Sequence, residues 1–264
     1  MLQTGAIGDP AIAAAMLEVP RHRFVPQLSL DDAYADKAVA IKERDGFVIS
    51  SISQPSMIAQ MLSLLDLRTG DRVLEIGTGS GYNAALTAAL AGPPGSVVTV
   101  DIEDDLLELA RERFAQLGYR TIAVLRADDL PALAGPFERI IVTARCRDID
   151  AQWWRLLADG GRIVAPLDIG YGGERAVGFV REEMRLRSIG SYACAFLELR
   201  GETEMASGTT FFRNRHERYR TVPSATAPLD IIAVRLRDAT PALLEGADAV
   251  IARPNTLFAV RSEL

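Results

Sequence analysis

The stretch that decides the fold is Asp71-Arg72-Val73-Leu74-Glu75-Ile76-Gly77-Thr78-Gly79-Ser80-Gly81-Tyr82. A short apolar run ends in three glycines at alternate positions, and the Ala/Leu-rich segment Asn83–Leu90 that follows is typical of a helix. Glycine allows a tight turn and lets a ligand come close to the backbone. Because open α/β sheets bind ligands at the carboxyl ends of their strands, this stretch predicts a binding loop between a strand and a helix.

Further along the chain, segments typical of strands alternate with segments typical of helices. The sequence predicts strands over Ser96–Asp101, Thr121–Arg126, Phe137–Thr143 and Gly161–Pro166, and helices over Asp104–Leu117 and Ala151–Leu157. Acidic residues begin the first of these helices, where the helix dipole favours them. The alternation predicts an α/β fold with a doubly wound, mostly parallel sheet that is covered by helices on both faces.

The two ends of the chain have different patterns. Before the glycine loop we expect a helix near residues 10–18, a loop-rich stretch over residues 33–55, and a helix over Ser56–Leu65 that Pro55 opens. After about residue 175 the pattern is strand-rich. We expect a main domain over residues 1–202, with an N-terminal helical cap, and a small α+β C-terminal extension over residues 203–264. The extension should contain two strands, DIIAVRL (230–236) and NTLFAVR (255–261), and a short helix, TPALLEGA (240–247).

Composition narrows the classes of partner. The 264 residues carry a formal net charge of −6, and a nucleic-acid backbone requires a basic surface, so nucleic acid is not the expected partner. Two cysteines and two histidines have no metal-ligand spacing, so we expect neither a metal site nor a disulfide framework. We find no signal peptide and no apolar run of membrane-spanning length, and expect a cytoplasmic protein, with a monomer favoured.

The acid that precedes the glycines indicates the class of ligand. A dinucleotide site reads G-x-G-x-x-G, whereas this loop reads G-x-G-x-G and follows Glu75. A carboxylate there would repel a pyrophosphate but suits a cationic ligand, such as a methionyl ammonium or a sulfonium. We therefore predict that S-adenosylmethionine binds here, with S-adenosylhomocysteine as its product, and that its contacts include Glu75, Gly77, Thr78, Gly79 and Gly81. A glycine turn without a ligand is the alternative.

Two further acids follow predicted strands. Asp101 lies about twenty residues after the last glycine of the loop, where an acid can accept hydrogen bonds from both ribose hydroxyls. The alternative is a helix N-cap, and the two roles can coexist. Ile102 is assigned to the same cofactor site. Asp128 and Asp129 follow the third strand, where a carboxylate can meet an adenine amino group. A polar loop is the alternative there.

These motifs together resemble the protein-L-isoaspartate O-methyltransferase family over about residues 10–200. The matching segments are VPRHRFVP (19–26), AYAD (33–36), ISQPSMIA (52–59), GDRVLEIGTGSGYNAA (70–85), ELARERFAQLGY (108–119), PFERIIVTA (136–144) and LLADGGRIVAP (156–166). The resemblance implies a Rossmann-like class I methyltransferase that transfers a methyl group from S-adenosylmethionine to a carboxylate of an aspartate-derived residue in a peptide or protein. It assigns to Ser53 a contact with the substrate carboxyl group, which we interpret as positioning.

Three features depart from the family pattern. The segment IKERDGFVISSISQP (41–55) is longer and more charged than usual, Ala127-Asp128-Asp129 replaces Gly-Asp-Gly, and the chain continues into residues 203–264. The long segment and the extension are similar to the subset that methylates an aspartate of lanthipeptides, lasso peptides or graspetides, whose ester then closes to an aspartimide. This favours a dedicated peptide substrate that the extension helps to recognise.

Other functions remain open at this point. The first alternative is general isoaspartate repair, and the second is a non-catalytic peptide-binding module on the same fold. A nucleic-acid methyltransferase is the weakest alternative, because the chain lacks a D/N-P-P-Y/F motif.

Overall fold

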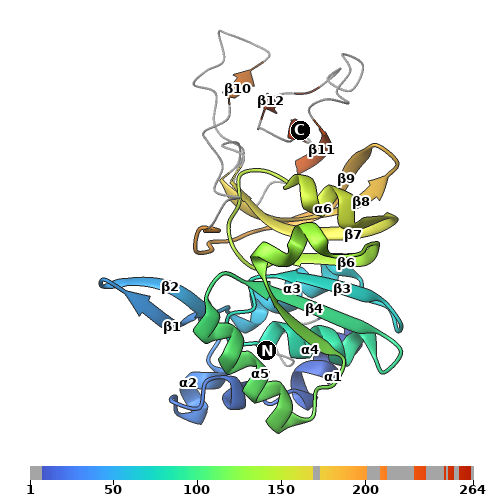
Figure 1. The fold of residues 1–264 in the computed structure, drawn as a ribbon. Coiled ribbons are helices and arrows are strands. Elements are labelled where there is room, and N and C mark those ends of the chain that lie inside the picture. The colour runs from blue at the N-terminus through green and yellow to red at the C-terminus, as the bar shows by residue number, and fades with distance from the viewer. Residues whose placement is uncertain are drawn as a thin grey trace.

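The computed structural model describes residues 8–168, 173–200, 209–212, 229–235, 247, 249–252 and 256–262. Eleven strands in these residues form one sheet, in the order β10-β12-β13-β11-β9-β8-β7-β6-β3-β4-β5 (Figure 1). The neighbours from β5 to β7 are parallel, and all pairings from β7 to β10 are antiparallel. The parallel strands are β3 (Arg72–Ile76), β4 (Ser96–Asp101), β5 (Ile122–Arg126), β6 (Phe137–Val142) and β7 (Leu157–Asp168). The predicted Rossmann-like α/β fold is confirmed.

Helices cover both faces of the parallel part of the sheet. The helical elements are α1 (Pro10–Glu18), η2 (Arg21–Phe24), α2 (Leu30–Tyr34), α3 (Pro55–Leu65), α4 (Tyr82–Ala91), α5 (Asp104–Leu117), η3 (Ala127–Ala132) and α6 (Ala151–Leu156). Because side chains alternate along a strand, Val73 of β3 joins the core that contains α1, α3, α4 and α5, whereas Leu74 joins the core that contains α6. No helix in the described ranges has both the length and the hydropathy of a membrane span.

The strand order reverses at β3. From β3 the chain passes through α4 to β4 on one side, and it later returns through η3 to β6 on the other side. The connections after β3 and β6 therefore diverge and leave a crevice at their carboxyl ends. This is the place where doubly wound sheets bind ligands, and the glycine loop follows β3 there.

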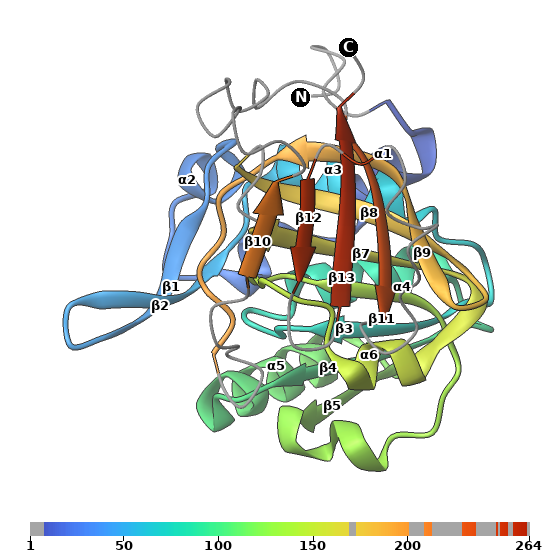
Figure 2. The ribbon, with the colours of Figure 1, turned by 90° about the horizontal axis from the view of Figure 1, so that it is seen from above.

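The prediction of a loop over residues 33–55 is wrong in part. Residues 39–52 form a hairpin of β1 (Val39–Arg44) and β2 (Phe47–Ile52), which projects from the molecule (Figures 1 and 2). Both strands are largely solvated, so they lack the alternation of apolar and polar residues that identifies a half-buried strand. The turn between them did carry a signal, because Asp45 and Gly46 have φ values of 53° and 78°, as expected for an Asp-Gly hairpin turn.

The strands beyond residue 203 continue the main sheet. The antiparallel part consists of β8 (Glu174–Glu182), β9 (Arg185–Ala193), β10 (Thr209–Phe212), β11 (Leu229–Arg235), β12 (Ala249–Ala252) and β13 (Thr256–Ser262). Strand β11 pairs with both β9 and β13, and seen from above β10–β13 run across β7 and β8 (Figure 2). Strands were predicted where β11 and β13 lie, but β10 and β12 were not predicted. The predicted helix over 240–247 lies outside the described residues, apart from Ala247.

The extension and the main sheet share one hydrophobic core. Phe258 of β13 and Ile231 of β11 are fully buried in the cluster that also contains Trp153 and Phe179. The Trp154 indole of α6 contacts the Thr256 hydroxyl at 3.4 Å. The boundary at residue 202 stays a prediction, but the strands on either side of it are packed together.

We expect Phe258→Ala to lower the free energy of unfolding by about 4 kcal/mol, because the change leaves a cavity in this shared core. Chemical denaturation followed by circular dichroism measures the effect. Leu17→Ala is the matched control, because Leu17 is 75% exposed and its loss should cost less than about 0.5 kcal/mol. Equal effects of the two changes would show that the extension does not share the core.

Candidate functional site

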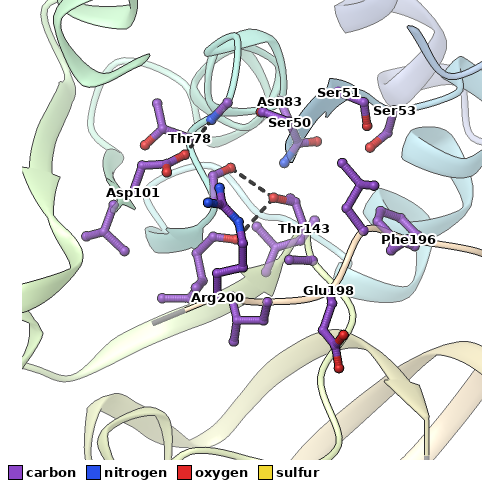
Figure 3. A pocket seen from close by; sticks show the side chains of 18 of the residues that line it. Ser50, Ser51, Ser53, Thr78, Asn83, Asp101, Thr143, Phe196, Glu198 and Arg200 are labelled. Carbon is purple, nitrogen blue, oxygen red and sulfur yellow. Dashed lines mark hydrogen bonds between the residues drawn. The ribbon is translucent and has the colours of Figure 1, made fainter. Parts of the chain in front are cut away.

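A cavity of about 1100 Å³ lies at the carboxyl ends of the central parallel strands (Figure 3). Its wall comes from the turns after β3, β4, β5 and β6, from β2, and from the segment after β9. Seven of the predicted site residues meet on this wall: Ser53, Gly77, Thr78, Gly79, Asp101, Ile102 and Asp128. The other two, Glu75 and Gly81, are not among the residues that line it.

The first glycine of the loop is required by close packing against β4 and β6. The N–H groups of Gly77 and Thr78 donate to the carbonyl oxygen of Val100, at 2.8 and 3.1 Å. Gly77 has a φ of 102°, and a Cβ there would overlap the hydroxyl of Thr143. That hydroxyl donates to the carbonyl oxygen of Gly77 at 2.9 Å. Thr143 therefore fixes the loop from β6, as Val100 does from β4.

The last glycine of the loop, Gly81, allows two helices to pack closely. Gly81 caps α4 with a φ of 85°, and a Cβ there would lie 2.8 Å from the ring of Phe114 in α5. Gly81 is therefore needed to pack α4 against α5, and its predicted contact with the cofactor stays a prediction.

Asp101 joins the glycine loop to the end of β4. One carboxylate oxygen accepts from the N–H of Gly79 at 2.9 Å, and the other accepts from the N–H groups of Ile102 and Glu103, at 2.8 and 3.2 Å. The N-cap of α5 is Glu103, so Asp101 does not take the predicted alternative role. Each carboxylate oxygen has two acceptor sites, so the oxygen bound to Gly79 can still accept from a ligand hydroxyl.

Glu75 lies behind the cavity wall. It is fully buried, and its two oxygens accept from the Asn83 amide at 2.7 Å and the Thr99 hydroxyl at 2.5 Å. Thr99 in turn lies 2.8 Å from the hydroxyl of Thr78. Burial raises the pKa of Glu75 to about 7, although the bonds from Thr99 and Asn83 oppose this shift. Glu75 therefore holds the wall residue Asn83 directly and the wall residue Thr78 through Thr99. A direct contact of Glu75 with the cofactor stays a prediction.

Asp128 lies at the exposed rim of the cavity, in η3 after β5. One of its oxygens pairs with the guanidinium of Arg126 at 3.1 Å, and Arg126 also pairs with Asp104. Within the described residues, the second oxygen of Asp128 accepts no hydrogen bond and forms no ion pair. A contact between Asp128 and an adenine therefore stays a prediction that this geometry allows.

Ser53 also lines the cavity, and a buried arginine holds its backbone in place. Ser51 and Ser53 lie together in the close-up view (Figure 3). Arg21 of η2 donates to the carbonyl oxygens of Ser53 and Ala33, at 2.9 and 2.7 Å. Its guanidinium lies 5.1 Å from the centre of the Tyr82 ring. Burial lowers the pKa of Arg21 from its usual value, and the charge interaction with Tyr82 opposes this.

Asp36 fixes the residues that follow Ser53. Its carboxylate accepts from the N–H of Ser56 at 2.9 Å and from the Gln54 amide at 3.1 Å. Burial acts to raise the pKa of Asp36, but these hydrogen bonds outweigh it and lower the pKa. The segments VPRHRFVP and AYAD thus serve a common purpose, which is to position the segment ISQP.

Residues 194–200, which follow β9, close the cavity from below in Figure 3. The N–H of Phe196 donates to the Glu174 carboxylate at 2.6 Å. The backbone of Arg145 exchanges hydrogen bonds with those of Leu197 and Leu199, each at 2.8 Å, and its guanidinium pairs with Glu198 at 3.3 Å. The segment is therefore anchored along its length.

Glu103 links the three parts of the wall. Its carboxylate accepts from Lys42 at 2.5 Å, from Arg44 at 2.7 Å and from Arg200 at 2.8 Å. Arg200 also donates to the carbonyl oxygen of Ile49 in β2 at 3.2 Å. Burial acts to raise the pKa of Glu103, but the bonds from Lys42 and Arg200 lower it to about 2. The hairpin, the turn after β4 and the segment after β9 therefore converge on one carboxylate.

Sequence reasoning missed several residues of this site. In the segment VPRHRFVP, His22 contacts the exposed hydroxyl of Tyr34, at 3.0 Å. The residue that reaches Ser53 is Arg21. Thr143 was detectable only as a polar residue that ends an apolar strand. The partners of Glu103 lie about 60 and 97 residues away along the chain, so no local pattern could have revealed them.

Known proteins are similar to this chain over most of its length. A family profile described as Protein-L-isoaspartate(D-aspartate) O-methyltransferase (PCMT) matches residues 1–201. Protein-L-isoaspartate O-methyltransferase from Methanopyrus kandleri is 38% identical over 201 residues, which cover 75% of this chain and 87% of the relative. The protein of the same name from Ignicoccus hospitalis is 39% identical over 170 residues, which cover 64% of this chain and 78% of the relative.

The chain belongs to the protein-L-isoaspartate O-methyltransferase family. It is therefore an S-adenosylmethionine-dependent carboxyl O-methyltransferase, which confirms the predicted enzyme class and cofactor.

Two solved structures support the fold of this methyltransferase. One that is named protein-L-isoaspartate O-methyltransferase has a TM-score of 0.70 at 22% identity and covers 100% of this chain and 86% of its own. A putative protein of that family from Plasmodium falciparum, solved in complex with S-adenosyl-L-homocysteine, has a TM-score of 0.62 at 21% identity and covers 75% of this chain and 94% of its own.

The cavity of this methyltransferase has the chemistry that the cofactor needs. The carboxylate of Asp101 can accept further hydrogen bonds, as ribose hydroxyls require, and the lining includes the apolar residues Ile102, Leu130 and Trp153, as a flat base requires. The volume of about 1100 Å³ exceeds that of an ordinary ligand pocket, so there is room for a cofactor and part of a substrate. Bound there, S-adenosylmethionine would supply a methyl group on a sulfonium.

The buried acid gives a pH-dependent prediction. The pKa of Glu75 is about 7 in the folded protein and 4.5 in its ordinary state, so the folded protein keeps its proton while the unfolded chain loses it. We expect the free energy of unfolding of the native protein, relative to Glu75→Gln, to fall as the pH rises from about 4.5 through 7. Urea titrations at pH 5, 6, 7 and 8 measure it. Parallel pH profiles for both proteins would contradict the assigned pKa.

Arg21→Met removes the hydrogen bonds to the carbonyl oxygens of Ser53 and Ala33, so we expect kcat/KM to fall at least tenfold. The affinity for S-adenosylhomocysteine should stay unchanged, because neither of these hydrogen bonds involves the glycine loop. Steady-state kinetics and calorimetry measure the two quantities. His22→Ala is the neighbouring control and should change neither. Equal loss of cofactor binding and turnover in Arg21→Met would indicate general unfolding instead.

Proposed function

We propose that this methyltransferase transfers the methyl group of S-adenosylmethionine to a carboxylate of an aspartate-derived residue in a peptide or protein. The observation that carries the proposal is the placement of Ser53 on the same cavity wall as the glycine loop, on a segment fixed by Arg21 and Asp36. The family resemblance assigns the substrate carboxyl group to this serine. The relatives from Methanopyrus kandleri and Ignicoccus hospitalis carry the protein-L-isoaspartate name.

The reaction needs alignment more than it needs a strong base. An aspartate-type carboxylate is already ionised near neutral pH, so no residue has to remove a proton. Ser53 would donate a hydrogen bond that orients one carboxylate oxygen, and proximity then supplies much of the rate. This bond should be modest in strength, because the carboxylate loses its charge as the ester forms. Ser53 is therefore a positioning residue.

The methyl ester has a further reaction that is intrinsic to the peptide. The next backbone nitrogen attacks the ester carbonyl carbon, methanol leaves, and a five-membered succinimide forms. Hydrolysis of that ring restores some normal aspartate in repair, whereas in tailoring the ring can itself be the product. The methyl transfer is common to both outcomes.

Two specific functions follow from this chemistry. General isoaspartate repair is supported by the names of the curated relatives. Tailoring of a dedicated ribosomally made peptide is supported by the long charged hairpin over residues 39–52, whose strand β2 lines the cavity. The extension is weaker support for tailoring. A solved structure that carries the protein-L-isoaspartate O-methyltransferase name covers 100% of this chain, so its match includes the extension. We retain for residues 203–264 the proposal that they help to recognise the substrate peptide.

Matched peptides separate the two functions. The enzyme is incubated with S-adenosylmethionine and with unrelated isoaspartyl peptides, their normal aspartyl counterparts, and any short peptide encoded beside its gene. Turnover of unrelated isoaspartyl peptides alone supports repair. Turnover of the partner peptide alone, with mass spectrometry showing a gained methyl group and then a lost methanol, supports tailoring. Cofactor binding without transfer to any carboxylate would contradict both.

Ser53→Ala should lower kcat/KM for the accepted peptide by about tenfold to a hundredfold, because a hydrogen bond to a charged group is lost from the aligned complex. The affinity for S-adenosylhomocysteine should not change. Ser51→Ala removes a neighbouring hydroxyl from the same wall and should have a smaller effect. A larger effect from Ser51→Ala would transfer the role to that residue.

A further inference from the structure

Arg200 occupies an unusual place on the cavity wall. Its guanidinium is fixed by Glu103 at 2.8 Å and by the carbonyl oxygen of Ile49 at 3.2 Å. These two bonds use two of its five N–H donors, and within the described residues the other three have no partner. A guanidinium held in one place with donors to spare is suited to bind a planar anion such as a carboxylate.

The other charged groups on the wall have the opposite sign. They are Asp101, Asp128, Asp150 and Glu198, so Arg200 is the one cation among the described lining residues. The acids are already engaged, since backbone N–H groups bind Asp101 and Asp150 and arginines bind Asp128 and Glu198. An anionic substrate that enters this cavity therefore meets one cation among the described lining residues, and that cation has N–H donors to spare.

Arg200 belongs to a group of ion pairs that has a small excess of positive charge. Lys42, Arg44 and Arg200 converge on Glu103, and Asp105 pairs with Lys42 at 2.5 Å. Three cationic side chains thus face two carboxylates, which leaves one positive charge in the group. Glu103 keeps its negative charge over the whole ordinary pH range, because the bonds from Lys42 and Arg200 outweigh the effect of burial on its pKa.

We propose that Arg200 binds a second carboxylate of the substrate peptide, next to the one that is methylated, and so selects aspartate sites with an acidic neighbour. This inference rests on the proposed function. The reacting carboxylate itself is the poorer ligand for Arg200, because a strong bond to it would oppose the loss of charge as the ester forms. A carboxylate that does not react keeps its charge throughout, so the same bond holds the peptide without slowing the transfer.

The test uses pairs of peptides that differ only in having Glu or Gln on either side of the target residue. The native enzyme should show a ratio of kcat/KM values of about tenfold in favour of Glu, and Arg200→Gln should reduce this ratio to about one. Arg200→Lys keeps the charge but loses the planar fork and should retain part of the preference. Arg187→Gln makes the same change on β9, where Arg187 pairs with Glu182, and should leave the ratio intact. Because the ratio compares two peptides on one enzyme, partial unfolding does not alter it.

Other outcomes overturn the inference in distinguishable ways. A native enzyme without preference, or an unchanged ratio in Arg200→Gln, contradicts the inference but leaves the proposed function standing. If Arg200→Gln weakens S-adenosylhomocysteine binding in calorimetry and lowers turnover of both peptides equally, the guanidinium binds the carboxylate of the cofactor. If the native enzyme binds S-adenosylhomocysteine but methylates neither peptide, the proposed function itself fails.

Discussion

The site depends on the way the end of β4 holds the glycine loop. The carbonyl oxygen of Val100 accepts from Gly77 and Thr78, and the carboxylate of Asp101 accepts from Gly79. These bonds satisfy backbone N–H groups in a loop whose glycines have positive φ values and cannot continue a strand or a helix. Because β3 and β4 are parallel neighbours, the loop is fixed at the edge of the crevice where the strand order reverses.

Two carboxylates support this site in contrasting ways. Glu75 is buried among neutral donors, so its charge is poorly solvated and burial raises its pKa to about 7. Glu103 is buried among cations, so its charge is favoured and its pKa is about 2. The first tightens the wall behind the glycine loop. Glu103 binds the hairpin and the segment after β9 to the turn that follows Asp101.

The connection through Glu103 links the predicted cofactor side of the cavity to its substrate side. Its N–H donates to Asp101, and its carboxylate holds Arg200 and the hairpin strand β1. The walls that would contact a peptide are thus anchored to the turn that would contact the ribose. The extension strands add to the same body, because β11 pairs with β9 and Phe258 shares a core with Trp153, a cavity residue.

The sequence by itself determined the alternation of strands and helices, the position of the glycine loop, and the position of Asp101 at the end of a strand. These features are local, since periodicity, glycine spacing and the residues that end a strand can be read within a few positions. Only the tertiary structure decided that Glu75 lies behind the cavity wall, that Arg21 binds the backbone of Ser53, and that Glu103 forms ion pairs with three cationic side chains. Those contacts join residues that are far apart along the chain, and burial and charge pairing between distant segments leave no periodic trace in the sequence.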